Sequence, residues 1–569
     1  MAEVLLSPGV LARENDSSQV TSQPTQAGAA VVGPTVKGPV NIPTVVSSYS
    51  DYQNTFGAKV ISGSQEYTYF TSVAAYNYFQ QGGDSLLVTR VVSGSYTAAT
   101  SSAVNNSDTV SAITLETLSV GSIQNSTSTE GSRGQLADGT RDNIRWEVVA
   151  PDTASGTFGL LVRQGNDITT QRSVLETWTN LSLDPNASNF ISRVIGDQVQ
   201  SVKSDGTDYY LQMTGSYSNA SRYVRVKTVN TPTLNYLDNA GQPKDAFTGS
   251  IPILSSGSFG DALGTDFNGV VANFNQNINA SNSQGLEGDN YTTALNLLAN
   301  PDEFQYNLIS LPGLYQTDYA TQISSLVNTS QYRGDSIAII DGVRYGSSIT
   351  AARTQAAGID SSYAATYWPW VQTIDPDLGD QVWVPASTLI PGVYAYNDES
   401  SEAWFAPAGL SRGGLGTVIR AERKLTNGNR DDLYQSGVNP IATFPNTGVV
   451  VFGQKTLQKK ASALDRVNVR RLLIALKGFI SQIADNLVFE QNTISTRNNF
   501  LAQVNPYLES VQQRQGLYAF KVVMDDSNNT PDVIDRNQLI GQIYLQPTKT
   551  AEFIYLDFNV LPTGATFPS

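Results

Sequence analysis

The chain has 569 residues, a formal net charge of −15, and no histidine or cysteine. At about 150 residues per domain this length predicts three or four domains, and the acidic charge argues against a general nucleic-acid binder or a protein of anionic membranes. Without histidine and cysteine the chain cannot build a Ser-His-Asp or Cys-His site, a disulfide or the usual zinc sites, so any enzyme would have to use carboxylates, lysine, tyrosine or an oxygen-ligated metal. We predict no cofactor and no enzyme. No run of about 18 apolar residues occurs, so we expect no direct insertion into a membrane.

Residues 1–20 are predicted to form an arm that is too short to hold a hydrophobic core. Its apolar residues lie on either side of a Pro-Gly turn; they are Val4, Leu5, Leu6 and Val10. Two interpretations of this arm stay open: a frayed terminus, and a strand that pairs with another subunit.

Residues 21–93 together with 301–438 are predicted to form one α/β core. Apolar runs at 27–32, 85–92, 307–311, 336–341 and 364–372 indicate strands, and residues 67–80 and 319–328 indicate helices. The β-α-β order with short connections favours a parallel or mixed sheet covered by helices. No strand leads into a GxxxxGK[ST] or GxGxxG loop, so we expect no phosphate-binding site.

Residues 94–300 interrupt this core and are predicted to form two β-rich insertions, at 94–205 and 206–300. The stretch from 93 to about 140 is rich in serine, threonine and asparagine, and the alternative for it is a disordered linker. Strand-like runs follow at 144–149, 158–162 and 209–229.

Two further groups of residues suggest ligand chemistry. Asp375, Asp377 and Asp380 resemble half of a calcium loop, although a surface turn around Pro376 and Gly379 explains them better. The tryptophans that could form a carbohydrate platform are Trp368, Trp370 and Trp383, for which core packing is the simpler explanation.

Residues 439–545 are predicted to form a C-terminal domain around the strongest helix of the sequence, at 465–489, with Asp465 as a plausible N-cap. Its apolar face recurs at steps of three and four and consists of Val469, Leu472, Leu473, Leu476, Ile480, Ile483 and Leu487. A different face carries basic side chains, which are Arg466, Arg470, Arg471 and Lys477. Strands are predicted at 518–524 and 542–546.

Residues 546–569 are predicted to form a C-terminal strand arm and tail. One side of a strand at 551–560 carries Ile554, Leu556, Phe558 and Val560. The fold class expected from the whole chain is α+β or mixed α/β, multidomain, with β-rich insertions and extended strand arms at both ends.

Several short motifs follow one another along the chain outside residues 94–300. They are Leu6-Ser7-Pro8-Gly9-Val10, Val384-Pro385-Ala386-Ser387, Gly392-Val393-Tyr394-Ala395, Trp404-Phe405-Ala406-Pro407-Ala408-Gly409, the run 448–457, Val467-Asn468-Val469-Arg470-Arg471-Leu472, Asn529-Thr530-Pro531 and the run 547–553. Each motif is modest, but their order and spacing together are specific, and they resemble the contractile tail sheath proteins of bacteriophages.

The resemblance implies a structural subunit that polymerises as stacked hexameric rings around a tail tube and contracts from a metastable extended state to drive the tube through the host envelope. It implies a place in the virion tail, assembled in the host cytoplasm, with the tail tube, baseplate and tail-terminator proteins as partners besides the chain itself. Both arms would complete a small sheet in a neighbouring subunit, and the basic helix would face the tube. For that helix, a solvated face or pairing between sheath subunits stays open as the alternative.

Two other functions stay open. The first is the sheath of a phage-derived bacteriocin or other contractile injection system, which uses the same chemistry. The second is a carboxylate-based glycan-active enzyme or a carbohydrate-binding module.

Overall fold

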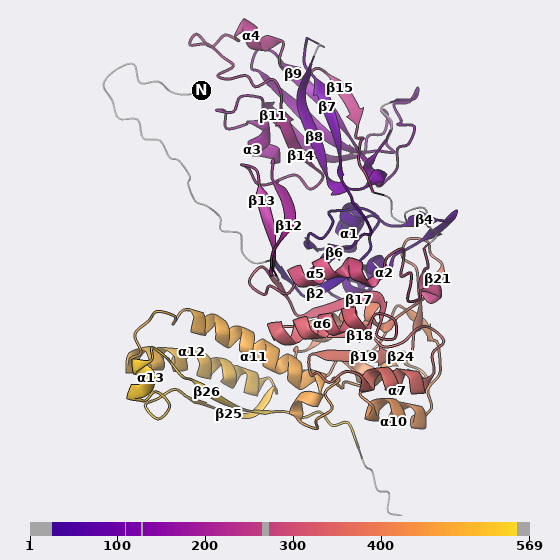
Figure 1. Ribbon diagram of the computed structural model, residues 1–569, viewed down its shortest axis with the longest axis vertical. Coiled ribbons are helices and arrows are strands. Elements are labelled where there is room, and N and C mark those ends of the chain that lie inside the picture. The colour runs from indigo at the N-terminus through magenta and orange to yellow at the C-terminus, as the bar shows by residue number, and fades with distance from the viewer. Residues whose placement is uncertain (1–24, 108–109, 127–128, 207, 265–271, 555–569) are drawn as a thin grey trace, which may run out of the picture.

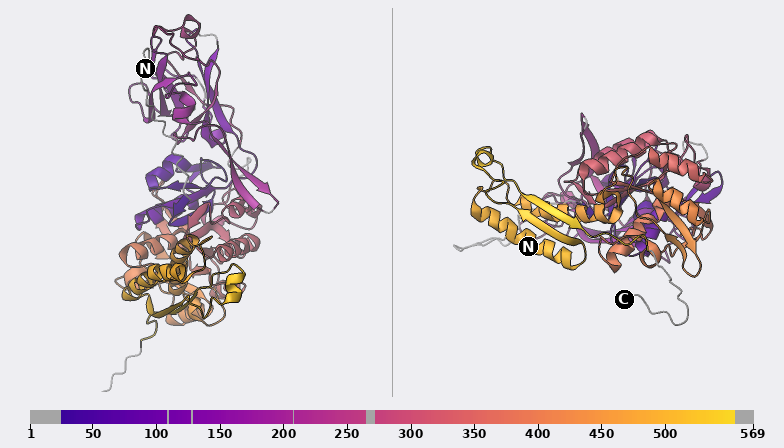
Figure 2. Two further views of the ribbon diagram at one scale, coloured as in Figure 1. Left: turned by 90° about the vertical axis from the view of Figure 1, so that its left-hand side faces the viewer. Right: turned by 90° about the horizontal axis from the view of Figure 1, so that it is seen from below.

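The computed structural model describes residues 25–107, 110–126, 129–206, 208–264 and 272–554. Three parts are arranged along the molecule: a β-rich lobe at one end, an α/β core in the middle, and a helical C-terminal lobe that projects to one side (Figures 1 and 2). The predicted arm residues Val4, Leu5, Leu6, Val10, Leu556, Phe558 and Val560 lie outside the described residues.

An eight-stranded mixed sheet forms the core, in the order β24-β23-β19-β18-β17-β2-β6-β3. Its inner pairs from β6 through β23 are parallel, and the edge strands β3 and β24 are antiparallel to their neighbours. The central strands are buried on both faces, which explains why their sequences are continuous apolar runs without alternation. The predicted mixed α/β class is confirmed. The strands are β2 (Ala29–Gly33), β3 (Thr44–Val46), β6 (Leu86–Arg90), β17 (Leu308–Tyr315), β18 (Ile337–Asp341), β19 (Ala364–Trp368), β23 (Val438–Phe444) and β24 (Gly448–Val451).

Helices cover both faces of this sheet, each with its own hydrophobic core. One face packs against α1 (Tyr49–Phe56), α2 (Phe70–Gln80) and α8 (Ile390–Ser400). The other packs against α5 (Thr292–Leu297), α6 (Ala320–Arg333), α7 (Ile349–Ala357) and α10 (Asn427–Gln435). Helix α2 begins three residues later than predicted because residues 65–67 pair as a strand. Helix α6 continues past its predicted end at residue 328 to Arg333, and the next residue, Gly334, ends it with a left-handed backbone at φ 73°.

Smaller elements complete the core. The three-stranded sheet β21-β20-β22 consists of β21 (Gln381–Val384), β20 (Val371–Ile374) and β22 (Val418–Ala421). The remaining pieces are β1 (Thr25–Ala27), paired with β16 (Phe304–Tyr306), the hairpin β4 (Val60–Ser62) and β5 (Gln65–Tyr67), and α9 (Gly409–Arg412).

The β-rich lobe lies between β6 and β17 in the chain and has a hydrophobic core of its own, to which residues from 99 to 262 contribute. Strands β7 (Ala98–Val104) and β8 (Ser111–Val120) lie within the stretch for which a disordered linker was the alternative, so that alternative is wrong for these strands. The sheets are β11-β10-β9-β15, β14-β8-β7 and the hairpin β12-β13. The elements are β7 (Ala98–Val104), β8 (Ser111–Val120), β9 (Ile144–Asp152), β10 (Thr157–Gln164), β11 (Val174–Ser182), α3 (Ile191–Ile195), β12 (Val199–Asp205), β13 (Asp208–Thr214), β14 (Val224–Val229), α4 (Asp245–Thr248) and β15 (Ser255–Ser258).

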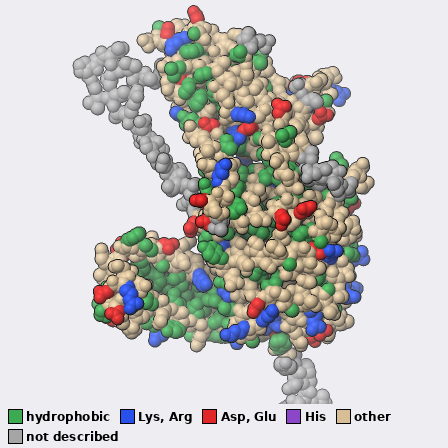
Figure 3. Space-filling view, viewed as in Figure 1, with side chains coloured by type: hydrophobic (Ala, Val, Ile, Leu, Met, Phe, Trp, Pro, Cys, Tyr) green, Lys and Arg blue, Asp and Glu red, His purple; other side chains and the backbone are tan. Residues whose placement is uncertain are grey.

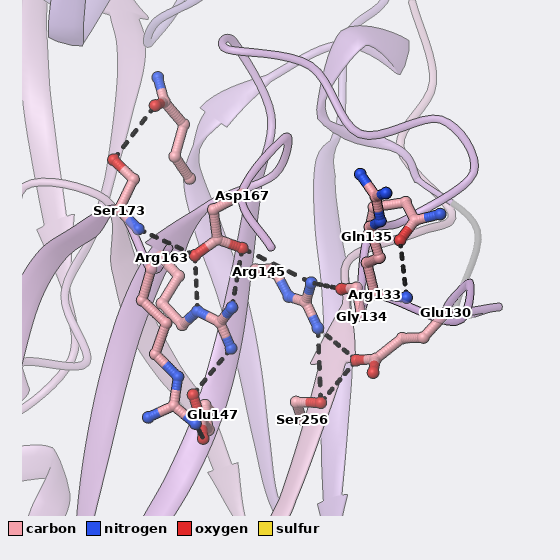
Figure 4. Close-up of polar contacts among 12 residues, drawn as sticks. Glu130, Arg133, Gly134, Gln135, Arg145, Glu147, Arg163, Asp167, Ser173 and Ser256 are labelled. Atoms are coloured by element: carbon pink, nitrogen blue, oxygen red, sulfur yellow. Dashed lines mark hydrogen bonds and ion pairs between the residues drawn. The ribbon is translucent and has the colours of Figure 1, made fainter. Parts of the chain in front are cut away.

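A buried ion network holds two loops of this lobe against its sheet (Figure 4). The Asp167 carboxylate accepts two hydrogen bonds from the Arg163 guanidinium, at 2.7 and 2.9 Å. Nη1 of Arg145 lies 3.5 Å from Oδ1 of Asp167. Arg145 also pairs with Glu130, and Arg163 pairs with Glu147 at 2.7 Å. Asp167 is therefore the shared counter-ion of two buried guanidinium groups.

Removing this counter-ion leaves two buried cations undercompensated. We expect Asp167→Ala to lower the free energy of unfolding by roughly 3–5 kcal/mol, measured by urea denaturation of the full chain. The matched control is Asp138→Ala, because Asp138 is exposed in the same lobe and forms no ion pair within the described ranges. An equal midpoint for the two variants would contradict the stabilising role of Asp167.

A second buried acid lies at the end of β18. The Asp341 carboxylate accepts from the Ser387 backbone N–H at 3.1 Å and from the Ser387 hydroxyl at 2.5 Å. Complete burial outweighs these hydrogen bonds and raises the pKa of Asp341 to about 7. The folded protein therefore holds this proton more tightly than the unfolded chain does.

A raised pKa in the folded state predicts that stability falls as pH rises from about 4 to about 7, because only the unfolded chain gains from ionisation there. We expect Asp341→Asn to remove this loss, since a carboxamide can make both contacts with Ser387 without charge. Relative to the unchanged protein, the variant should gain up to about 4 kcal/mol at pH 8 and little at pH 4. A gain of the same size at both pH values, measured by chemical denaturation, would contradict this account.

Candidate intersubunit interface

The C-terminal lobe is a pair of helices packed on a two-stranded sheet, around a core that includes Leu472, Leu476, Phe500, Val504 and Leu508. Its elements are α11 (Val467–Asp485), α12 (Ile494–Gln513), β25 (Leu517–Val523), α13 (Pro531–Asp535) and β26 (Gln542–Pro547). The predicted strands are confirmed, and the predicted apolar face of the first helix faces this core from Leu472 onward. Val469, Leu472, Leu476 and Ile483 are buried, and Leu473, Ile480 and Leu487 are half-buried.

The predicted helix at 465–489 is too long at both ends. Asp465 belongs to a short 3₁₀ turn, and Arg466 occupies the N-cap position with an extended backbone at φ −116° and ψ 135°. The helix ends at Asp485, so Leu487 lies in the following turn. Helix α12 was not predicted at all. Its buried residues Phe500, Val504, Leu508 and Val511 recur at steps of four and three, which is the signal that identifies it.

The hairpin β25–β26 is the feature most open to a partner strand. Phe520, Val522, Ile543 and Leu545 pack against the lobe's core, whereas Tyr518 and Tyr544 on the other face are 63% and 56% exposed. Within the part of the chain that the structure describes, neither outer edge of this hairpin pairs with another strand. Two-stranded sheets are marginal alone, and their unpaired N–H and C=O groups form a template for further strands.

Beside the hairpin, a groove of about 980 Å³ separates the C-terminal lobe from the α/β core. Aromatic side chains dominate its apolar lining, including Trp404, Phe405, Tyr434, Phe452 and Tyr518. The chain's own residues 548–553 form part of its wall. The groove therefore lies where the described chain ends and where the sheet is open.

The segment that follows β26 is anchored along this groove by polar contacts. Gln454 Nε2 donates to the Thr550 hydroxyl at 2.6 Å and to Glu552 Oε1 at 3.0 Å. Arg466 donates two hydrogen bonds to the Glu552 carboxylate, from Nε at 2.8 Å and from Nη2 at 2.9 Å. Burial opposes ionisation of Glu552, but the hydrogen bonds from Arg466 and Gln454 outweigh it and hold the pKa of this carboxyl below its usual value. Glu552 thus fixes the position from which the chain leaves the lobe.

The predicted strand at 551–560 is wrong for its described part. Residues 551–554 form no strand, and Ile554 is 75% exposed. The anchoring contacts of Thr550 and Glu552 are made by side chains, so they hold the segment without the strand pairing that its alternation suggested.

The three arginines at the start of α11 point into the protein, and we call Arg466, Arg470 and Arg471 the arginine joint. Arg471 pairs with Asp398 of α8 at 2.7 Å and lies over the Tyr394 ring at 5.0 Å from its centroid. Arg470 donates to the Ser362 hydroxyl and lies over the Tyr363 ring at 4.0 Å. Although burial disfavours its charge, Asp398 outweighs this and raises the pKa of Arg471.

The expectation of one exposed basic face therefore needs correction. Arg470 and Arg471 are each 5% exposed, and Arg466 is engaged with Glu552, so these cations serve contacts within the chain. The sequence spacing groups them correctly but cannot show that the first turns of α11 dock into the core. Lys477 is exposed and forms no ion pair among the described residues. A contact of this helix with a tube stays a prediction.

Hydrophobic side chains gather over α11 on the outside of the C-terminal lobe (Figure 3). The half-buried Leu473, Ile474 and Ile480 and the 38% exposed Phe479 belong to this helix, and the Phe479 ring stacks on Tyr507 of α12 at 3.7 Å between centroids. Lys477 lies four residues after Leu473, so it shares their side of the helix. Among the exposed residues of α11, Phe479 is apolar, Lys477 and Asp485 are charged, and Gly478, Ser481 and Gln482 are small or polar.

The residues considered for ligand chemistry have structural partners. Asp375 accepts from Thr68 and from two backbone N–H groups of its own turn, and Trp368 and Trp370 are each 3% exposed within the core. Over the described ranges no group of three or more acidic side chains is arranged to hold a metal ion. No helix in those ranges is long and apolar enough to cross a membrane.

Comparison with known families identifies two adjacent domains in this chain. Residues 262–457 match the phage tail sheath protein central domain. Residues 459–561 match the phage tail sheath C-terminal domain. The two matches together cover more than half of the chain, and the second one contains the hairpin, α11, α12 and the anchored segment.

Individual relatives carry the same description. The tail sheath protein of Vibrio phage KVP40 is 39% identical over 236 residues, which cover 41% of this chain and 35% of the relative. The tail sheath protein of Enterobacteria phage T4 is 37% identical over 209 residues, which cover 37% of this chain and 32% of the relative. The chain thus matches about a third of the length of these curated relatives. The crystal structure of a sheath tail protein from Listeria innocua superimposes with a TM-score of 0.52 over 92% of this chain and 95% of the Listeria chain. The sequence identity is 11%, so this is a likeness of fold alone.

The arginine joint predicts unequal effects for two cations of one helix. We expect Arg471→Ala to lower the free energy of unfolding by roughly 2–4 kcal/mol, somewhat less than a fully buried pair because the Asp398 side chain is 36% exposed. Lys477→Ala on the same helix should change it by less than about 0.5 kcal/mol. Guanidinium unfolding of the full chain gives the free energy of unfolding of each variant. Equal losses for the two variants would contradict a stabilising role of the arginine joint.

Proposed function

The chain belongs to the phage tail sheath protein family, and from this membership and its open hairpin we propose that it is a structural subunit of a contractile tail sheath. In this proposal copies polymerise as stacked hexameric rings around the tail tube. The assembly contracts from a metastable extended state and drives the tube through the host envelope. The single observation that supports self-assembly most strongly is the two-stranded sheet β25–β26, whose outer edges are unpaired in the described chain.

The strand donors in this proposal are the two arms of neighbouring copies. On the N-terminal arm the apolar residues are Val4, Leu5, Leu6 and Val10, and on the C-terminal arm they are Ile554, Leu556, Phe558 and Val560. Strand addition forms main-chain hydrogen bonds, which do not depend on the orientation of the domains at either end of the arm. Four to six such bonds at about 1 kcal/mol each would give a few kcal/mol for each linkage.

The anchor at Glu552 supports the same proposal. Because Arg466 and Gln454 hold this residue, a pull on the chain beyond it acts on the core through Gln454 and on the first turn of α11 through Arg466. The C-terminal arm is therefore linked to the rigid part of the subunit. In the proposed contraction the energy comes from new interactions that form between subunits, and such links transmit it.

The proposed partners besides the chain itself are the tail tube, baseplate and tail-terminator proteins, and the proposed location is the virion tail, assembled in the host cytoplasm. Of the four basic residues predicted to contact the tube, Lys477 has the exposure that this role requires. The β-rich lobe, at the far end of the molecule from the C-terminal lobe, would lie on the outside of the sheath (Figure 1).

The sheath of a phage-derived bacteriocin or other contractile injection system remains the second candidate, because it requires the same subunit. The two curated relatives named above are tail sheath proteins of phages, which favours a phage tail. The family is one of structural proteins. Trp368 and Trp370 are buried in the core, so two of the three tryptophans that suggested a carbohydrate platform are inaccessible to a glycan, and Trp383 is half-buried beside Arg420.

The proposal predicts that the purified full chain forms long hollow striated tubes in negative-stain electron microscopy. Replacing Val4, Leu5 and Leu6 together with serine should abolish the tubes, because the arm would lose the apolar side chains of its strand. Glu14→Gln in the same arm is the control and should leave them intact. Monodisperse monomers of the unchanged chain at every salt concentration would overturn the proposed function.

A further inference from the structure

The tip of the C-terminal lobe exposes hydrophobic side chains that its own fold does not cover. In the turn between α11 and α12, Val488 is 61% exposed and Phe489 102%, and Ile494 at the start of α12 is 63% exposed. Phe489 also has a positive φ of 71°, which strains a residue with a Cβ atom. The turn is nevertheless held in place, since Asn492 Nδ2 donates to the Gln538 carbonyl at 2.9 Å. A fully exposed phenyl ring beside other exposed apolar side chains is typical of a surface that is covered in an assembly.

Acidic side chains surround this apolar tip. Residues 485–490 and 525–536, which adjoin it, contain six carboxylates and one cation. Asp485 and Glu490 are exposed and have no ion pair within the described part of the chain. We call Asp485, Val488, Phe489, Glu490 and Ile494 the acidic tip.

A surface of the opposite character lies on the three-stranded sheet of the core. Strand register places Trp383, Gln372 and Arg420 side by side, with Arg420 Nε donating to Gln372 Oε1 at 2.7 Å and its guanidinium 5.3 Å from the Trp383 ring centroid. A register shift between β20 and β22 leaves Ile419 unpaired and 44% exposed.

Two more exposed cations follow on the same segment. Arg423 and Lys424, like Arg420, form no ion pair in the described ranges, and the intervening Glu422 turns away to accept from the Gly346 N–H at 2.7 Å. Residues 409–477 contain twelve lysines and arginines against four carboxylates in a chain of net charge −15. We call Ile419, Arg420, Arg423 and Lys424 the basic face.

The two surfaces lie on opposite sides of the molecule, with α13 of the tip region at the left of Figure 1 and β21 of the three-stranded sheet at the right. Each combines exposed apolar groups with unpaired charges, and the charges are of opposite sign. We propose that the acidic tip of one copy docks on the basic face of the next copy. Because the two faces differ, each copy offers one of each, and the contact propagates around a ring or along a helix.

This inference rests on the proposed self-assembly and assigns it a lateral contact that does not involve the arms. A second copy is favoured over another partner because this chain itself carries the complementary surface. Phe489 contributes the apolar part of the contact and Glu490 the steering charge, while Arg423 and Lys424 supply the counter-charges.

Exchanging the charges tests the contact. Glu490→Lys and Lys424→Glu should each raise the critical concentration for polymer formation at least about tenfold in a sedimentation assay, and the double variant should recover most of that loss. Arg133→Glu is the control, because Arg133 is an exposed arginine of the β-rich lobe without an ion pair in the described ranges, and it should have no effect. High salt should raise the critical concentration of the unchanged chain, because salt screens the charge contact. It should change the critical concentration of the single variants less, because they have already lost that contact.

A second variant separates docking from folding. Phe489→Gly relieves the positive φ and removes no buried group, so its melting temperature should equal or exceed that of the unchanged chain. Its critical concentration should nevertheless rise about tenfold. A lower melting temperature with unchanged assembly would overturn the role of Phe489.

The outcomes distinguish this contact from the proposed function. If the unchanged chain polymerises and neither single charge variant alters its critical concentration, the contact is overturned and the proposed function stands. If Glu490→Lys leaves assembly unchanged but weakens sedimentation with purified tube protein, the tip contacts the tube instead of a second copy. If the unchanged chain never polymerises, both the contact and the proposed function are overturned.

Discussion

Docking of the first turns of α11 into the α/β core is the constraint on which the rest of the subunit depends. A buried guanidinium group is stable only where a charge or an aromatic face compensates its loss of water, and each member of the arginine joint has such a partner on a different segment. Asp398 belongs to α8, Tyr363 precedes β19, and Glu552 follows β26. The helix is therefore fixed in direction as well as in position, and the lobe built on it cannot swing freely.

The same rigidity extends to the far end of the molecule. The hairpin β12–β13 reaches from the β-rich lobe to the core, where Val202, Tyr209 and Leu211 pack against the hydrophobic cluster beneath α5 and α6. Ion pairs join the two parts again, Arg222 with Asp51 at 2.6 Å and Lys37 with Asp142 at 3.7 Å. Arg222 is exposed, so its pair contributes little energy, whereas Lys37 is buried; together with the hairpin the two pairs define one orientation. In the proposed sheath, a subunit braced in this way would transmit force as a single body.

The sequence was informative wherever one environment dictates one pattern. Strands buried on both faces had to be continuous apolar runs, so β2, β6, β17 and β18 were predicted to within a few residues. Helix α12 was missed because Pro506 and many polar side chains obscure its buried stripe. For Arg470 and Arg471 the spacing gave the correct grouping and the wrong exposure, since periodicity along one helix contains no information on which other segment covers it. The tip at Phe489 was missed for a related reason, because an exposed phenylalanine in a turn has no periodic signature.

A polymer that must first hold and then rearrange needs two kinds of contact between its copies. Strands shared between subunits keep their hydrogen bonds when the bodies they connect rotate, so they can persist through a change of shape. Charge contacts between rigid faces have the opposite property, because their energy falls steeply with distance and is screened by salt. In the proposed polymer, a strand added to the open hairpin would be of the first kind, and the acidic tip and basic face would be of the second. With both kinds on one lobe and core, the proposed polymer would exchange its releasable contacts while the shared strands prevent the copies from separating.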